Sequence, residues 1–151
     1  MNHVLTQPEQ ALAQTLAMLQ QSRLPEALHT VRMAVATHPQ DARLRFLLAS
    51  LLAGQGEFDA AEHEMAQTTA LDPSMLIAHF QLGSLRMTSG NGPGALAAWQ
   101  PLATLPDSHP LRCFSLGCTA LIADDFEQAT QWLQRGLDLP SENTPLNRDM
   151  S

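Results

Sequence analysis

Apolar and small residues recur along the chain in one register, at a spacing of 34 residues. Four alanines keep this spacing: Ala27, Ala61, Ala95 and Ala129. Three leucines, each followed by a small residue, keep it as well: Leu48-Ala49, Leu82-Gly83 and Leu116-Gly117. Large apolar residues form a further set in the same phase: Leu24, Phe58 and Phe126. A period of this length indicates an array of repeated supersecondary units.

Turn signals separate two helical segments within each period. The signals are the segments 54–56 and 89–93 and the pair Asp124-Asp125. The segments between them are rich in good helix formers and poor in β-branched residues. Pro39 and Pro73 stop the second segment of their units because proline lacks the amide that the helix needs. We expect first helices at 8–21, 41–54, 75–88 and 109–123, and second helices at 25–37, 58–70, 93–104 and 126–138.

This pattern resembles the tetratricopeptide repeat family. The family motif has a Leu–small pair in the first helix, an alanine in the second and a proline shortly after. The segments 82–95 and 116–129 carry the pair and the alanine, and Leu48-Ala49, Ala61 and Pro73 carry a close variant. The resemblance covers about residues 8 to 141. It implies an all-α fold, a right-handed superhelical α-solenoid of about four helix pairs, in a single domain over residues 1–151 with repeats at 8–41, 42–75, 76–109 and 110–143.

The chain departs from the family motif where large aromatic residues usually pack in the first helix. One such position carries Arg45, His79 and Cys113, and the other carries Leu52, Arg86 and Ala120. The first unit has Gln14-Thr15 in place of the Leu–small pair.

The C-terminal residues 144–151 are expected to form a cap or a tail. Thr144-Pro145 is typical of a helix start, and Leu146 and Met150 are four residues apart, so they would lie on one helix face. A short capping helix would cover the last repeat. The alternative is that the chain is part of a longer array.

The resemblance implies a concave groove lined by the first helices, at positions spaced i, i+3, i+7 and i+10. The predicted groove residues are Leu12, Leu16, Leu19, Arg43, Phe46, Ser50, Ile77, Phe80, Ser84, Met87, Leu111, Phe114, Cys118 and Leu121. An open apolar surface usually marks a binding site, and Met and Phe suit recognition of apolar side chains. We therefore expect a protein–protein interaction module, an adaptor or a secretion-type chaperone, that binds an apolar or amphipathic peptide segment. This wall lacks the Lys, Arg and Asn set with which some family members clamp acidic C-terminal peptides.

Other roles for the same residues stay open at this point. They would also fit a repeat core, or a face covered by the chain's own ends or by a second copy. A self-associating structural subunit, including a homodimer, and a repeat segment of a larger protein are therefore alternatives.

Charge and hydropathy exclude some classes of binding partner. A net charge of −7 argues against nucleic acid, which demands a basic surface. No apolar run approaches the roughly 20 residues of a membrane span, so no membrane insertion is expected. No basic residue precedes the first apolar segment as it would in a signal peptide, and a cytoplasmic location is expected.

Candidate chemistry is sparse, and we expect no enzyme, no cofactor and no metal. Cys113 and Cys118 are predicted to be free thiols, at least partly buried, because a spacing of five points them in different directions on a helix. The segment 62–64, Glu-His-Glu, lacks a second His one turn away. The glycine-rich segment 90–94 has neither a preceding strand nor a lysine, so it is expected to be a loose turn rather than a phosphate loop. The acidic groups near residues 59–64 and 124–127 are expected to be helix starts and solvated surface.

Overall fold

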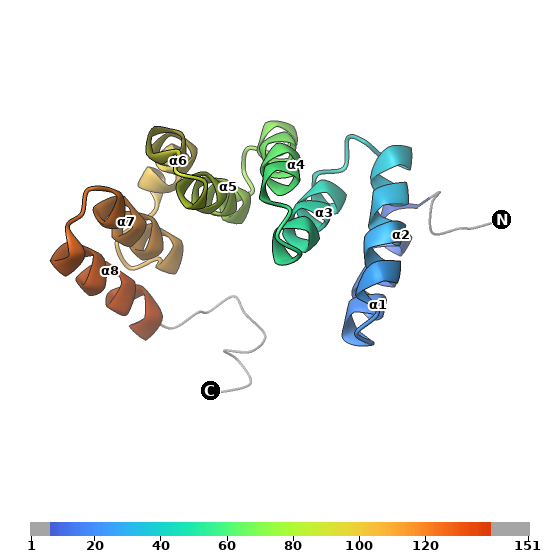
Figure 1. Ribbon diagram of the computed structural model, residues 1–151, viewed down its shortest axis with the longest axis horizontal. Helices are drawn as coiled ribbons and strands as arrows, with labels where there is room; N and C mark the ends of the chain where they lie inside the picture. Colours follow the sequence, from blue (N-terminus) through green and yellow to red (C-terminus); the bar gives the residue numbers. More distant parts are fainter. Residues whose placement is uncertain (1–6, 140–151) are drawn as a thin grey trace. The chain divides into compact units, whose positions relative to one another are not determined.

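A computed structural model describes residues 7–139, and within this range the chain is a succession of helix pairs without a strand (Figure 1). The helices are α1 (Pro8–Gln20), α2 (Leu24–Thr37), α3 (Ala42–Gly54), α4 (Phe58–Leu71), α5 (Leu76–Thr88), α6 (Gly92–Trp99), the 3-10 helix η2 (Gln100–Thr104), α7 (Pro110–Ile122) and α8 (Phe126–Asp138). The predicted all-α class and helix pairs are confirmed. The predicted cap or tail at 144–151 lies outside the described residues.

One second helix is shorter than predicted. A continuous helix was expected over 93–104, but α6 ends at Trp99 and the chain continues as η2. Pro101 explains the change, because it has no amide to donate to Ala97 and its ring would collide with that carbonyl. The tighter 3-10 turn carries the chain onward and still buries Leu102 completely.

The turn inside each helix pair has the same backbone geometry, repeated every 34 residues. One residue in each turn has positive φ: Ser22 (59°), Gly56 (84°), Gly90 (87°) and Asp124 (61°). The amide that follows donates to a carbonyl five residues earlier, over 2.8–3.0 Å, in the bonds Arg23–Met18, Glu57–Leu52, Asn91–Arg86 and Asp125–Ala120. This is the Schellman arrangement that ends helices. The turn at 90–94 is therefore well defined rather than loose, and the Asn91 carboxamide oxygen accepts from the Gly94 amide at 2.9 Å.

The chain divides into two compact units at the boundary between Ala78 and His79, inside α5. We call them the N-terminal unit and the C-terminal unit. In the N-terminal unit, α1 packs on α2, α2 on α3, and α3 on α4. In the C-terminal unit, α7 packs on α8, and both α6 and η2 contact α7. The division of the whole chain into one domain of four repeats remains a prediction.

The small residue after the periodic leucine is matched in size to a residue of the second helix. Ala49 and Met65 are both buried in the N-terminal unit. In the C-terminal unit a Cβ added to Gly83 would collide with the Trp99 indole, and one added to Gly117 would lie 2.6 Å from Leu133 Cδ2. The first helix therefore carries glycine where the second helix carries Trp or Leu, and alanine where it carries Met.

Candidate binding surface on the first helices

The fourteen predicted groove residues lie on helix faces that remain at least partly open. None of them belongs to the buried residues of its helix. The buried positions of the same helices lie on other faces, for example Thr15 on α1 and Leu44 and Leu48 on α3. The two most exposed apolar groove positions are Leu16 at 45% and Ile77 at 38%. All fourteen residues are therefore at least partly exposed, and their assignment to a binding groove stays a prediction.

Groove residues of the N-terminal unit come from α1 and α3, with Ile77 from the start of α5. Leu12, Leu19 and Phe46 are half-buried beside the exposed Leu16. The hydroxyl of Ser50 donates to the Phe46 carbonyl at 3.0 Å. That bond turns the hydroxyl toward its own helix, so the position contributes little polarity to the surface.

Arg43, the one charged residue among the predicted groove positions, is already paired. Its Nη2 lies 2.9 Å from Asp41 Oδ2 and 3.2 Å from Glu9 Oε2. These carboxylates raise the pKa of the Arg43 guanidinium further above its usual range. In return, the hydrogen bond from Arg43 lowers the pKa of Asp41, and a backbone hydrogen bond together with Arg43 lowers that of Glu9. Asp41 also caps α3 by accepting from the Arg43 and Leu44 amides.

Groove residues of the C-terminal unit are organised around an aromatic cluster. The ring of Phe80 stacks on Trp99 at a centroid distance of 6.4 Å and meets Phe114 at 6.3 Å. Trp99 Nε1 donates to the Phe80 carbonyl at 3.1 Å, which satisfies the buried indole. The Phe80 side chain is therefore partly exposed on the groove face and at the same time packed against two other rings. Sequence reasoning missed Trp99, although it occupies the same 34-residue register as Met65 and Leu133.

The Ser84 hydroxyl repeats the behaviour of Ser50, donating to the Phe80 carbonyl at 3.0 Å. Leu111 and Leu121 are half-buried on α7, and so is Cys118, whose thiol pKa is raised by burial. Both cysteines are free, as predicted, and Cys113 is fully buried with its Sγ 3.1 Å from the Asp107 carbonyl oxygen.

A small pocket opens where α5 and α7 reach the turns of the C-terminal unit. It has a volume of about 290 Å³ and is lined by Met87, Gly90, Gly92, Leu121 and Ile122. Met87 and Leu121 are predicted groove residues. The sequence analysis missed Gly90, Gly92 and Ile122, and the signal that was available is the glycine at position 92, where the register elsewhere carries Leu24, Phe58 and Phe126.

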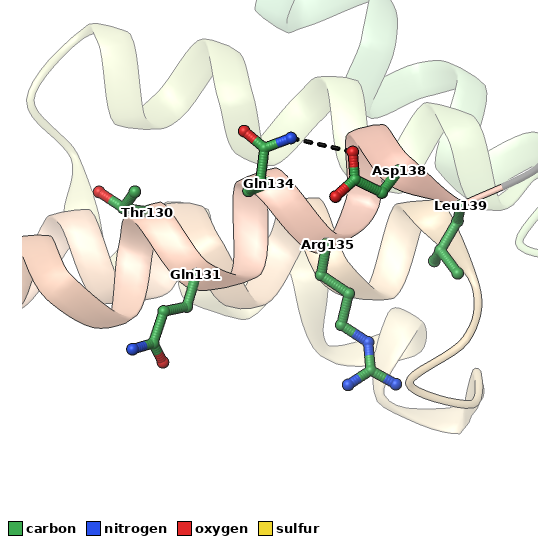
Figure 2. Close-up of a pocket in the computed structure, with 6 residues that line it drawn as sticks. All are labelled: Thr130, Gln131, Gln134, Arg135, Asp138 and Leu139. Atoms are coloured by element: carbon green, nitrogen blue, oxygen red, sulfur yellow. Dashed lines mark hydrogen bonds between the residues drawn. The ribbon is translucent and has the colours of Figure 1, made fainter.

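A wider hollow of about 540 Å³ lies along α8, away from the predicted groove positions (Figure 2). Five of its six lining residues have polar side chains, the exception being Leu139. Figure 2 shows the Gln134 carboxamide bonded to Asp138, a contact of 2.9 Å. The Arg135 guanidinium lies 5.7 Å from the ring of Trp132. The hollow is bordered by α8 and the residue after it, so it offers an open surface rather than an enclosed site.

Within residues 7–139, no group of three or more His, Cys, Asp or Glu side chains is placed to hold a metal ion. Over the same range, no helix combines the length and the apolar character needed to cross a bilayer.

The comparisons with known proteins agree with the architecture. A family model described as "Tetratricopeptide repeat" matches residues 18–79. The search of curated protein sequences gave no match. Among solved structures, a crystal structure of MamA has a TM-score of 0.70 at 17% identity, covering 86% of this chain and 76% of MamA.

Two other solved structures have the same TM-score of 0.70. Pseudomonas aeruginosa PilF is 15% identical over 89% of this chain and 61% of its own. YrrB, described as a TPR protein with an unusual peptide-binding site, is 16% identical over 93% of this chain and 72% of its own. At these identities the likeness concerns the fold.

Proposed function

We propose that this chain, whose residues 18–79 match a tetratricopeptide repeat model, is a protein–protein interaction module whose first helices bind an apolar or amphipathic segment of another polypeptide. The observation that carries the proposal is the partial exposure of all fourteen groove residues, most of them apolar. A protein of this size seldom leaves such a series of apolar side chains open without a use for it. Each unit offers one such face.

The polar groups of this surface favour an apolar ligand over an acidic peptide terminus. Ser50 and Ser84 donate to carbonyls of their own helices. Arg43 is engaged by Asp41 and Glu9, so binding a carboxylate there would require breaking existing ion pairs. Apolar burial is therefore the main source of affinity that these faces offer.

The test is a selection of random 12-residue peptides displayed on phage against the whole chain. The sequence contains no lysine, so an amine-reactive biotin labels only the amino terminus and presents every molecule in one orientation. We expect enriched peptides to contain two or more apolar residues. Their affinities are then measured by fluorescence anisotropy.

Leu16→Glu and Met33→Glu form a matched pair for that measurement. Both residues are exposed to a similar degree, 45% and 42%, but Leu16 lies on the first helix α1 and Met33 on the second helix α2. Peptides that bind the N-terminal unit should lose about tenfold or more in affinity with Leu16→Glu and little with Met33→Glu. Equal losses in both variants, or no enrichment of peptides, would reject the proposal.

The finer role, an adaptor or a secretion-type chaperone in the cytoplasm, is part of the same proposal. An adaptable apolar surface suits a chaperone that holds an apolar segment of its client. YrrB, with the same fold, is itself described as having a peptide-binding site.

Self-association is the second candidate, favoured by the exposure of α8. Phe126 is 65% and Leu137 is 70% exposed, and the two are eleven residues apart on one helix face. A second copy meeting this face would bury both. Sedimentation velocity of the wild type and of Leu137→Asp would decide, because only a dimer through α8 is weakened by the substitution.

A further inference from the structure

We propose that the pocket between α5, α7 and the turn at 90–92 is an anchor site for one apolar side chain of the bound segment, with a basic residue beside that side chain. This inference rests on the proposed function, because it specifies what the C-terminal unit recognises. The pocket takes two groove residues, Met87 and Leu121, as its walls and is therefore part of the same surface.

The pocket lies where the repeat register lacks a large side chain. The first residue of the second helix is Gly92 in this repeat and Leu24, Phe58 or Phe126 in the other three repeats. A Cβ placed on Gly92 would lie 3.2 Å from Ile122 Cγ2, so even alanine would narrow the opening. Gly90, with φ of +87°, holds the turn in a conformation that side chains disfavour. In the other repeats the residue at this position is itself partly exposed, with Phe58 at 45% and Phe126 at 65%, so a ligand side chain would add apolar contacts that Gly92 cannot make.

The size and lining of the pocket define the anchor. Every lining side chain is apolar, and the volume of about 290 Å³ lies at the lower limit of small-molecule sites, about 300–1,000 Å³. It suits one Leu, Ile, Met or Phe side chain rather than a cofactor. Hydrophobic transfer from water supplies the affinity.

The charge beside the pocket selects the neighbouring residue of the ligand. Asp124 and Asp125 follow the pocket residue Ile122, and the Asp124 amide donates to the Leu121 carbonyl at 3.0 Å. The Asp125 carboxylate caps α8 by accepting from the Gln128 amide, whereas Asp124 is exposed. Arg86, the residue before Met87, donates to the Gly94 carbonyl at 3.2 Å, and the two aspartates outnumber this one cation. An acidic turn next to an apolar pocket favours a Lys or Arg adjacent to the anchor.

The probe is acetyl-Leu-Arg-amide, titrated into the ¹⁵N-labelled whole chain and followed by NMR. We expect millimolar binding with shifts concentrated on the Gly90, Gly92 and Leu121 amides. Acetyl-Ala-Arg-amide should bind at least about tenfold more weakly, because a smaller side chain leaves the pocket unfilled. Acetyl-Leu-Glu-amide should bind a few-fold more weakly, with a difference that shrinks at high salt.

Three variants isolate the site. Gly92→Leu supplies the missing side chain from within and should abolish the shifts at Gly90 and Leu121. If that variant does not fold, Met87→Trp fills the pocket from a half-exposed position, with Met33→Trp as its matched control on α2. Asp124→Asn removes the charge, and asparagine tolerates positive φ, so the turn is preserved.

The outcomes separate this inference from the proposed function. Enrichment of peptides on phage without any probe shift in the pocket would overturn the anchor site and leave peptide binding intact. Pocket shifts that survive both Gly92→Leu and Met87→Trp would also overturn it. Pocket shifts that vanish in the filled variants, together with a failed phage selection, would support the anchor and reject the wider binding role.

Discussion

The two units connect the helices of a pair by different means. In the N-terminal unit, Arg45 on α3 and Glu64 on α4 form an ion pair of 2.8 Å with both side chains only 17% exposed. The same two repeat positions in the C-terminal unit carry His79 with Ala98, and Cys113 with Trp132. There the ring of Phe80 on α5 stacks on Trp99 of α6, the second helix of the same pair. The Phe80 ring also meets Phe114 on α7, the first helix of the next pair.

This difference shows which parts of the repeat determine the backbone and which are exchangeable. The turn geometry and the buried alanines are the same in both units. The contacts between the first and second helix are not, because charge pairs and rings can each fill the same space. The exchange has a consequence at the surface: rings shape the groove face of the C-terminal unit, whereas Arg43 and its carboxylates border that of the N-terminal unit.

Gly83→Ala is expected to have the largest effect on stability. The added Cβ would meet the Trp99 indole, and Trp99 is only 4% exposed and cannot move aside freely. We expect the free energy of unfolding to fall by about 1–3 kcal/mol, even though alanine has the higher helix propensity by about 1 kcal/mol. Urea denaturation followed by circular dichroism measures the loss.

A double-mutant cycle tests whether the small residue of the first helix and the large residue of the second helix are matched in size. Trp99→Met in the Gly83→Ala background recreates the Ala49–Met65 combination of the N-terminal unit. The two substitutions should therefore couple favourably, by about 1 kcal/mol or more. Strictly additive effects would show that Gly83 and Trp99 are not matched to each other.

Helix caps give a smaller difference between the units. The second helices α6 and α8 are capped by the side chains of Asn91 and Asp125, whereas Arg23 and Glu57 provide no side-chain cap to α2 and α4. Asp125→Ala should cost about 1 kcal/mol, and Glu57→Asn should add about 0.5–1 kcal/mol. Thermal unfolding of the two variants gives both values, and a destabilising Glu57→Asn would contradict the comparison.

Acid should weaken the ion pairs of Arg43 with Asp41 and Glu9, and we expect this to change the stability least. The pKa values of Asp41 and Glu9 are lowered in the folded state, so their contribution is complete above the unfolded values of about 3.9 and 4.3. It is lost as the pH falls through the lower folded values, because protonation then removes the partners of Arg43. The urea midpoint of the wild type should fall over that window.

Asp41→Asn provides the comparison for the acid effect. This variant lacks one of the two titrating partners and should show a flatter pH dependence. The Glu9 side chain is 69% exposed, so added salt should reduce the difference further. Identical pH profiles would mean that Asp41 titrates alike in the folded and unfolded chain.

Most of the fold follows from the sequence because the repeat supplies the same information several times. The 34-residue period located every helix to within a residue or two, apart from the early end of α6. That error arose because the register of the other repeats was extended over Pro101. A local rule, the missing proline amide, prevailed over the period there.

The surface could be predicted only in part. Helical spacing selected residues that are at least partly exposed, because residues on one face of a helix share their exposure, and their role as a groove stays a prediction. It could not show that Arg43 is paired with Glu9, 34 residues away, or that Phe80 lies between two other rings. Such contacts depend on how neighbouring helices pack. In the sequence, the pocket at Gly92 appeared only as a departure from the repeat register. Its volume and its lining depend on the conformation of the turn, which the sequence pattern does not give.

The four turns with one residue at positive φ also constrain how such a chain can change in length. Each turn closes with a bond from the amide after that residue to a carbonyl five residues earlier, so a single inserted residue would break both the bond and the phase of the helix that follows. Removal or duplication of a whole block of 34 residues preserves every turn. Growth and shortening by entire modules is therefore the route that this backbone leaves open to evolution and to protein engineering.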